Sequence, residues 1–508
     1  MENEKARRIL RFAAVSVLAA AALWFSFFGI HRSFWFDECC SVEIANTSWS
    51  GIIQNLKTNA HTPPLYYFLL KVWMALFGAD EAGARSLSAL FYLFSIPAVY
   101  FLGKTLFDRK TGLLAAFLFL ANPMAVQFAQ FARMYSLLGL LAILSTLFFV
   151  QQFSSGQASK KNWAVYVAVN VAGTFTHYWF FFLLLAQGIV YLWLFSKSSF
   201  KSFALAMLAS LAPFFLLWTP VLWMQATNGG TSGITRPGAG VLAETLLIFW
   251  GGGKKAAFLY GAFLALLFIR LEGGMLKFRL PAGFTEFLRR KEILILLAVL
   301  TVSLGTPWLI SQFNPIYIAT KYTMLALFAV LLLIAPFLAR FGDRILLPAF
   351  CTLLFMVTVG NFTGRRLHPP PDSIRSLTEF LLEKSRPGDL LLLPASAWGG
   401  TEYYLKRLGE QNRFIRFPFP AEVAAHPCWP DLNRWTEPYL KNEADALLNR
   451  VEAQIGKAPA RIWLLNGNLP RVDDAIKAGL DARFRPLDES EIGASYLPLR
   501  NLVFAYQK

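Results

Sequence analysis

The sequence has few charged residues and lacks the common motifs of soluble enzymes. Asp, Glu, Lys and Arg make up 16% of its 508 residues, against about 25% in an ordinary soluble domain. The part after residue 364 shows no glycine-rich phosphate loop, no nucleophile elbow and no metal-ligand spacing. The chain contains 56% hydrophobic residues and has a mean hydropathy of +0.46. This composition and these absences exclude a cytosolic globular enzyme and a disordered chain. The chain is predicted to be a polytopic membrane protein.

Cysteine is also scarce, with four residues in the whole chain. This number excludes a disulfide-stabilised scaffold. Cys39 and Cys40 are adjacent, which favours neither a disulfide between them nor a metal site. We interpret the cysteines as small apolar side chains.

The formal net charge of +17 raises the question of a nucleic-acid partner. Most of the basic residues before position 345 lie in short clusters between apolar runs, such as Lys104 to Lys110 and Arg289 to Lys291. This is the positive-inside pattern of membrane proteins, which records orientation. We therefore predict a membrane as the partner and no nucleic acid.

Apolar runs long enough to cross a bilayer need about 20 residues. Eleven are predicted, with a membrane domain over residues 1–363 and a soluble α/β domain over residues 364–508. The predicted spans are 9–30, 84–104, 111–130, 132–152, 162–177, 179–195, 202–223, 256–271, 293–311, 322–339 and 344–362.

The basic clusters fall on alternate loops, which orients the spans. The amino terminus is predicted to be cytoplasmic and the carboxyl-terminal domain to lie outside, in the periplasm of a bacterial inner membrane. The same alternation exports three connections with few basic residues, 31–83, 224–255 and 312–321. We expect the chemistry on this shared face.

The exported loop 31–83 contains an apolar and aromatic stretch, Leu65–Phe77, that is too short to cross a bilayer comfortably. It predicts a helix at the interface, with Tyr66, Tyr67 and Trp73 among the lipid headgroups. A second interfacial helix is predicted over residues 47–56, capped by Ser48 or Ser50.

The region after the prolines at 369–371 has the pattern of a small α/β domain. Short apolar strands are predicted at 389–393 and 461–465, and helices at 373–384, 401–408 and 440–455.

Asp37 and Glu38 follow an aromatic triplet directly after the first span. Two carboxylates near hydrocarbon are costly unless they have a role or a partner. Their side chains diverge by about 100° on a helix, so one can face a cavity while protein holds the other. Such a carboxylate can act as a general base on an acceptor hydroxyl; a solvated acidic edge is the alternative.

Other candidate residues map to the same face. His61 precedes two prolines, and it is either a hydrogen-bonded loop residue or a substrate contact. Arg85 is expected to pair with Glu81, four residues away. Arg133 can extend to the lipid headgroups, and Lys321 either does the same or pairs with a phosphate. The remaining candidates are Tyr135, His177 and Tyr322.

The order of these segments resembles the membrane glycosyltransferases of the C-type superfamily, in particular bacterial relatives of protein O-mannosyltransferases and of the lipid A aminoarabinose transferase. The resemblance rests on Trp-Phe-Asp-Glu at 35–38, His-Thr-Pro-Pro-Leu-Tyr-Tyr at 61–67 and Ala-Arg-Met-Tyr-Ser at 132–136, followed by Lys321 and Tyr322. It covers about residues 9–340.

The resemblance implies transfer of a sugar from a polyprenyl phosphate to a lipid, glycan or protein acceptor, usually with inversion. It would make Asp37 the general base and place Lys321 and Arg133 at the leaving phosphate. Glu38, His61 and His177 would line the sugar or acceptor pocket. The family often carries arginine where this chain has Lys321, and lysine near the position of His61.

Two other functions remain open from the sequence. A transporter or flippase of lipid-linked substrates would more often carry ionisable groups at mid-span. A non-catalytic assembly protein would tolerate replacement of Asp37 and Lys321. No metal or other cofactor is predicted, because no residue spacing calls for one.

Overall fold

The computed structural model describes most of the chain. The described residues are 2–58, 62–154, 157–195, 197–227, 234–250, 258, 261–263, 265, 269–272, 275–278, 283–341, 346–367, 373–424, 432–456, 461–467, 469–488 and 503–507.

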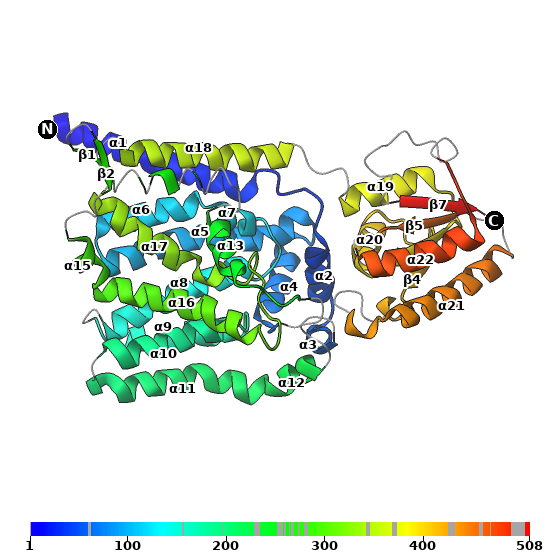
Figure 1. Cartoon of the computed structure of the whole chain (residues 1–508), viewed down its shortest axis with the longest axis horizontal. Coiled ribbons are helices and arrows are strands. Elements are labelled where there is room, and N and C mark those ends of the chain that lie inside the picture. Colours follow the sequence, from blue (N-terminus) through cyan, green and yellow to red (C-terminus); the bar gives the residue numbers. More distant parts are fainter. Residues whose placement is uncertain are drawn as a thin grey trace.

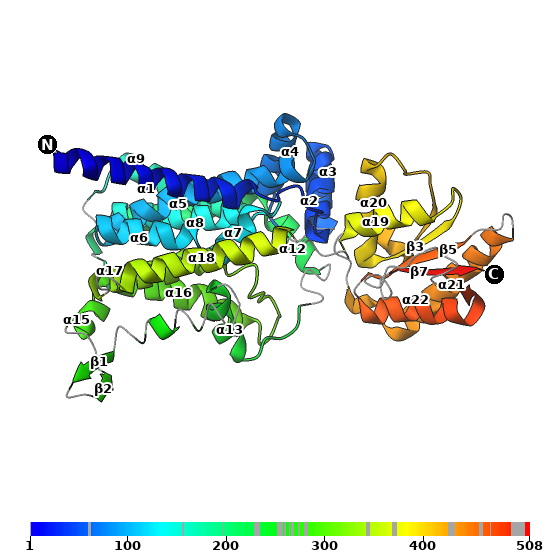
Figure 2. The same cartoon turned by 90° about the horizontal axis from the view of Figure 1, so that it is seen from above.

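The molecule has two lobes, a bundle of long helices and a smaller α/β lobe that contacts one end of it (Figures 1 and 2). The helices of the bundle, hereafter the helical lobe, are α1 (Glu2–Phe27), α2 (Phe36–Asn46), α3 (Trp49–Thr58), α4 (Leu65–Phe77), α5 (Glu81–Leu106), α6 (Arg109–Leu120), α7 (Pro123–Ala129), α8 (Tyr135–Phe153), α9 (Lys160–Thr174), α10 (Phe180–Leu194), α11 (Phe200–Leu217), α12 (Thr219–Thr227), α13 (Gly240–Phe249), α15 (Phe284–Leu288), α16 (Lys291–Ile310), α17 (Met324–Phe341) and α18 (Leu346–Leu367).

Within the described residues, five helices are long and apolar enough to cross a membrane, namely α5, α8, α11, α16 and α18. A sixth span arises if α6 and α7, which meet at a 60° bend, count as one. The predicted count of eleven is not confirmed. Several predicted spans are shorter helices: α10 has 15 residues and so extends about 22 Å, less than the roughly 30 Å of a bilayer core.

The predicted span 256–271 lies largely outside the described residues, and its described end is not helical. Residues Ile269–Glu272 form strand β1, which pairs antiparallel with β2 (Met275–Phe278). The physical reason is visible in the sequence, because Arg270 and Glu272 alternate with Ile269 and Leu271 as in a strand.

The loop after the first helix folds into α2, α3 and α4. Ser48 caps α3, since its Oγ accepts a hydrogen bond from the Gly51 N–H at 3.0 Å. Helix α4 forms where the interfacial helix was predicted. The expectation that Tyr66 and Tyr67 face lipid headgroups is wrong, because both side chains are fully buried in protein.

The second lobe is built on a five-stranded sheet in the order β4-β3-β5-β7-β6. Strands β3, β4 and β5 are parallel, whereas β7 runs antiparallel to β5 and β6. Its elements are α19 (Ile374–Lys384), β3 (Leu390–Pro394), α20 (Ala395–Arg407), β4 (Ile415–Phe419), α21 (Glu437–Ile455), β5 (Ile462–Leu465), α22 (Pro470–Arg483), β6 (Arg485–Pro486) and β7 (Val503–Gln507).

The run of four leucines in β3 is explained by burial on both faces of the sheet. Leu390 and Leu392 belong to the core formed with α21 and α22, and Leu391 and Leu393 to the core formed with α19 and α20. The lobe is therefore a three-layer α/β/α unit. The strands predicted at 389–393 and 461–465 correspond to β3 and β5, and the helix predicted at 401–408 begins earlier, at Ala395.

The two lobes meet where α20 packs on α2, and we call this contact the lobe junction. The hydroxyl of Tyr404 accepts a hydrogen bond from the Phe34 N–H at 2.7 Å and donates one to Glu81 Oε1 at 2.9 Å. Arg375 and Arg407 lie 3.5 Å and 3.3 Å from the Glu81 carboxylate. The α/β lobe thus holds the segment that leads into α2.

Candidate active site

Helix α2 begins at Phe36, the last residue of the aromatic triplet, and carries Asp37 and Glu38 in its first turn. The Glu38 side chain folds back and accepts a hydrogen bond from the Trp35 N–H at 2.9 Å, which stabilises the helix start. The two carboxylates point in different directions, as expected for neighbours on a helix. They therefore have separate surroundings.

Glu38 forms a buried, bidentate ion pair with Arg85. The guanidinium donates to its two oxygens at 2.8 Å and 2.7 Å, and both side chains are 1% exposed. Glu38 also accepts a hydrogen bond from the Ala132 N–H. The predicted Arg85–Glu81 pair is wrong: Arg85 reaches across to Glu38 and to the carbonyls of residues 30, 32 and 33, and Glu81 turns to the α/β lobe.

Asp37 lies on the other side of this turn, against Lys321. Lys321 Nζ lies 2.6 Å from Asp37 Oδ2; the lysine side chain is 31% exposed, the aspartate side chain 9%. Burial opposes ionisation of Asp37, but Arg133 and Lys321 outweigh it and hold the pKa of this carboxyl below its ordinary value. Asp37 is therefore a carboxylate at neutral pH, next to a cation that a ligand can reach.

Arg133 places a second cation beside Asp37. Its Nη1 donates to Ser41 Oγ at 3.1 Å and to the Tyr67 hydroxyl at 3.2 Å. Ser41 in turn donates to the Asp37 carbonyl. Arg133 is buried, so the alternative in which it extends to the lipid headgroups does not hold. A buried cation needs compensating charge, and Asp37 contributes it.

Aromatic side chains form a wall next to the two cations. The ring of Tyr322 lies 4.7 Å from the ring of His177, 5.5 Å from that of Trp179 and 6.3 Å from that of Tyr135. Arg133 lies 6.0 Å from the Tyr135 ring. Four predicted residues are thus brought together beside Asp37. They are Arg133 just before α8, Tyr135 at its start, His177 in the α9–α10 turn and Tyr322 before α17.

His177 shows an unused hydrogen-bonding group in this wall. Its Nδ1 accepts a hydrogen bond from the Trp179 N–H at 3.1 Å, so the ring proton resides on Nε2. Among the described residues Nε2 has no hydrogen-bond partner, and it is buried. A buried donor without a partner is costly, so this atom is suited to contact a ligand.

His61 lies outside the described residues. Tyr67 and Ser41, which hold Arg133, were not predicted as site residues; the signal for Tyr67 was its place in the His-Thr-Pro-Pro-Leu-Tyr-Tyr segment.

Among the described residues no three His, Cys, Asp or Glu side chains form a group that could hold a metal ion.

The sequence profile of the dolichyl-phosphate-mannose-protein mannosyltransferase family matches residues 61–223. No protein of curated function matches by direct comparison.

Two solved structures of ArnT from Cupriavidus metallidurans have a similar fold. The apo form aligns with a TM-score of 0.58 and 14% identity over 98% of each chain. The form bound to undecaprenyl phosphate aligns with a TM-score of 0.58 and 15% identity over 97% of this chain and 98% of that one. The chain therefore shares the fold of ArnT, and this likeness together with the family match confirms the predicted resemblance.

Proposed function

We propose that the chain transfers a sugar from a polyprenyl-phosphate donor to an acceptor hydroxyl, with Asp37 as general base. The observation that carries the proposal is the buried Asp37 carboxylate between the cations of Lys321 and Arg133. The family match and the likeness to ArnT, one structure of which holds undecaprenyl phosphate, support a lipid-phosphate substrate.

The proposed reaction is a single displacement at the anomeric carbon. The acceptor hydroxyl gives its proton to Asp37 as its oxygen bonds to that carbon. The bond from the carbon to the phosphate oxygen breaks, and the lipid phosphate leaves with the electron pair. Attack opposite the leaving group inverts the configuration of the sugar.

The two cations are suited to the charge that develops on the departing phosphate. Fixed positive groups at this point lower the barrier most when they are already in place. Arg133 is fixed by Ser41 and Tyr67, whereas Lys321 is held mainly by Asp37. The Nε2–H of His177 provides a further donor for the sugar or the phosphate.

The ion pair between Lys321 and Asp37 also suggests how donor binding activates the base. A cation beside a carboxylate makes it a weaker base. When Lys321 turns to the donor phosphate, Asp37 loses this neighbour and becomes a stronger proton acceptor. Binding of the donor would thus prepare the enzyme for the acceptor.

Glu38 has a different part in this proposal. Arg85 and two backbone N–H groups occupy its oxygens, so we assign it to positioning the start of α2. This replaces its predicted contact with the substrate. His61 keeps its predicted contact with the substrate as a proposal.

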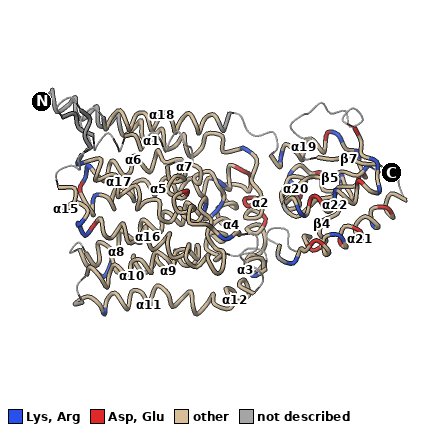
Figure 3. The backbone as a smooth tube through the Cα atoms, viewed as in Figure 1, with Lys and Arg blue, Asp and Glu red and all other residues tan. Residues whose placement is uncertain are grey.

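The membrane orientation is part of the proposal. In Figure 3 basic residues gather at the end of the helical lobe away from the α/β lobe, as expected for a cytoplasmic face. The site and the α/β lobe would then lie at the periplasmic face of a bacterial inner membrane.

The test is transfer by the purified protein. The chain is extracted with its lipids, copurified polyprenyl-phosphate sugars are identified by mass spectrometry, and turnover is followed with candidate lipid, glycan and protein acceptors. Sugar transfer that is lost in Asp37→Asn and kept in Glu383→Gln, an exposed carboxylate on α19, supports the proposal. Movement of an intact lipid-linked sugar across liposomes without transfer would indicate a flippase instead.

A further inference from the structure

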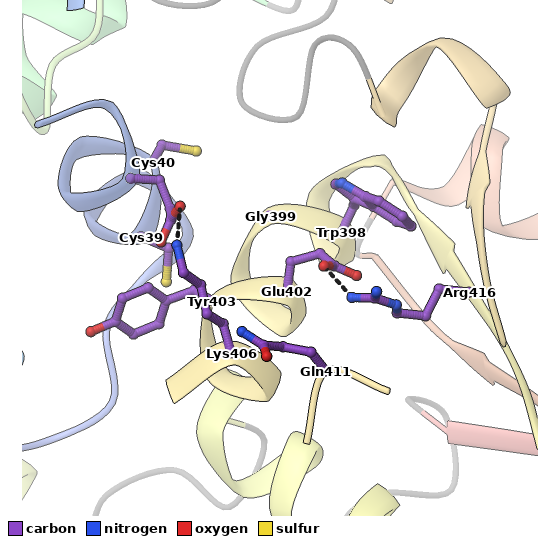
Figure 4. Close-up of a pocket in the computed structure, with 10 residues that line it drawn as sticks. Cys39, Cys40, Trp398, Gly399, Glu402, Tyr403, Lys406, Gln411 and Arg416 are labelled. Carbon is purple, nitrogen blue, oxygen red and sulfur yellow. Dashed lines mark hydrogen bonds and ion pairs between the residues drawn. The ribbon is translucent and has the colours of Figure 1, made fainter. Parts of the chain in front are cut away.

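A cavity of about 470 Å³ lies at the lobe junction (Figure 4). This volume is within the range of roughly 300 to 1,000 Å³ common for small-molecule sites. The first loop contributes Cys39, Cys40 and Glu43 on α2, and the α/β lobe contributes Trp398, Gly399, Glu402, Tyr403, Lys406, Gln411 and Arg416.

The cavity is distinct from the candidate active site, although both use α2. Successive residues on a helix turn by about 100°, so Cys39 and Glu43 face away from Asp37 and Ser41, and Cys40 lies between the two faces. A molecule in the cavity would lie beside the site, with α2 between it and Lys321. It would contact a part of a substrate remote from the reacting atoms.

The charges that line the cavity are compensated in pairs. Glu402 forms an ion pair with Arg416, and Glu43 lies 3.6 Å from Lys406. Two acids and two bases leave no net charge, and this balance disfavours a phosphate or another strongly charged ligand. The lining suits a neutral, polar molecule.

Glu402 also has hydrogen-bonding capacity to spare. Its Oε2 is taken by Arg416, but its Oε1 is buried and has no partner among the described residues. Burial, only partly offset by Arg416, raises the pKa of this carboxyl. A ligand hydroxyl that donates to Oε1 would remove the cost of the missing hydrogen bond.

Trp398 supplies an aromatic part of the lining. Figure 4 shows its indole ring near Glu402 and Arg416. A sugar has one apolar ring face and a rim of hydroxyls, which matches an aromatic face beside a carboxylate, a guanidinium and the amide of Gln411.

We propose that this cavity is a binding site for a neutral sugar unit of the acceptor. The inference rests on the proposed glycosyl transfer and names a class of acceptor for it, one that carries a glycan. The sugar ring would lie on Trp398, with hydroxyls bonded to Glu402 Oε1 and Arg416, while the acceptor hydroxyl to be modified reaches Asp37 around α2.

The test measures binding without turnover. Saturation-transfer NMR and titration calorimetry are carried out on the full-length protein in detergent with maltotriose, mannotriose and N-acetylchitotriose. At least one of these should bind, and Trp398→Ala and Glu402→Gln should each raise its Kd about tenfold or more, an effect of the size of one aromatic contact or hydrogen bond.

Trp193→Ala is the matched control, because this tryptophan is 65% exposed on α10 and does not line the cavity. Gln411→Ala is a second cavity variant at an exposed position and should weaken binding even if Trp398→Ala does not fold. No binding of any of the three sugars, or equal binding by the cavity variants and the control, would overturn the proposal.

The two proposals fail in different ways. Asp37→Asn should bind the trisaccharide as the native protein does, because Asp37 does not line the cavity. Sugar binding without any transfer by the native protein would refute the enzymatic proposal, and transfer that is insensitive to the cavity variants would refute the acceptor site.

Discussion

Asp37 and Glu38 are neighbours on α2, yet their surroundings differ in kind. Glu38 is buried in an ion pair with Arg85, and both side chains are 1% exposed. Two backbone N–H groups donate further hydrogen bonds to Glu38. Asp37 is held mainly by Lys321, whose side chain is 31% exposed. A cation neutralises the charge of each carboxylate, but only Asp37 has a cation that can turn away to a ligand.

This difference separates a structural ion pair from a reactive one. A fully satisfied buried pair loses much when one partner is removed and offers nothing to a substrate. A carboxylate with a single accessible partner can change its protonation and contacts during a reaction. The predictions below test the contrast between the two sides of α2.

The largest effect is expected for Asp37→Asn. The amide keeps the shape but cannot take a proton, so the rate of transfer should fall by about 10² to 10⁴, as measured by turnover of a lipid-linked sugar. The Tm in detergent should be somewhat lower, because Arg133 and Lys321 lose their compensating charge, but the protein should still fold. Turnover within tenfold of the native rate would show that another group is the base.

Replacement of Arg85 by Ala should act on stability instead. It leaves Glu38 as a buried carboxylate without its cation, which costs about 3 to 5 kcal/mol. We expect loss of folded protein in size-exclusion chromatography or a markedly lower Tm. The double variant Arg85→Met with Glu38→Gln should recover part of the loss; a fully stable Arg85→Ala protein would contradict the contrast.

Lys321→Ala should lower kcat by about 10² to 10³, the loss typical of one charge-stabilising group. Lys321→Arg should retain most of the activity, because a guanidinium keeps the positive charge beside Asp37 and pairs well with a phosphate. The measurement is kcat at saturating donor, with Lys384→Ala on the surface of the α/β lobe as a control. An unchanged kcat in Lys321→Ala would remove the cation from the mechanism.

Tyr404→Phe should have a smaller effect, on the stability of the contact between the two lobes. It removes the hydroxyl that joins the Phe34 N–H to Glu81 and leaves buried groups unsatisfied, at about 1 to 3 kcal/mol. A lower Tm, measured by a thermal shift in detergent, is expected. Tyr439→Phe, on α21 and packed against the core of the α/β lobe, is the control; equal shifts in the two variants would argue against the link.

The smallest effect concerns pH. Neighbouring cations hold the pKa of Asp37 below its ordinary value of 3.8, so its ion pair stabilises the fold above that value and this contribution is lost as the pH falls through the lower folded pKa. Infrared difference spectra of native protein and Asp37→Asn should show the protonated carboxyl band only below pH 3.8. In Lys321→Ala the band should appear at higher pH.

The sequence alone predicted the class of fold and the residues around Asp37 because these signals are local. Apolar runs, basic loops and short ordered motifs can be read without knowing what packs against what. The structure brings Asp37, Arg133, Tyr135, His177, Lys321 and Tyr322 into one place, as the shared membrane face suggested.

The sequence could not predict the partners that come from distant segments. Arg85 was assigned to Glu81 by helix spacing. It pairs instead with Glu38, 47 residues away, because the loop folds back over α5. Glu81 then pairs with Arg375 and Arg407 of the other lobe. The hairpin of β1 and β2 was missed because its apolar residues extended a predicted span.

The bond between Phe34 and Tyr404 joins residues 370 positions apart. At a synthesis rate of about 5 to 20 residues per second, the ribosome needs roughly 20 to 70 seconds to deliver the second partner after the first. Membrane insertion of the early helices therefore precedes formation of the lobe junction. A nascent chain stalled before α20 would be anchored in the bilayer, but the segment before α2 would lack its hydrogen bond to Tyr404.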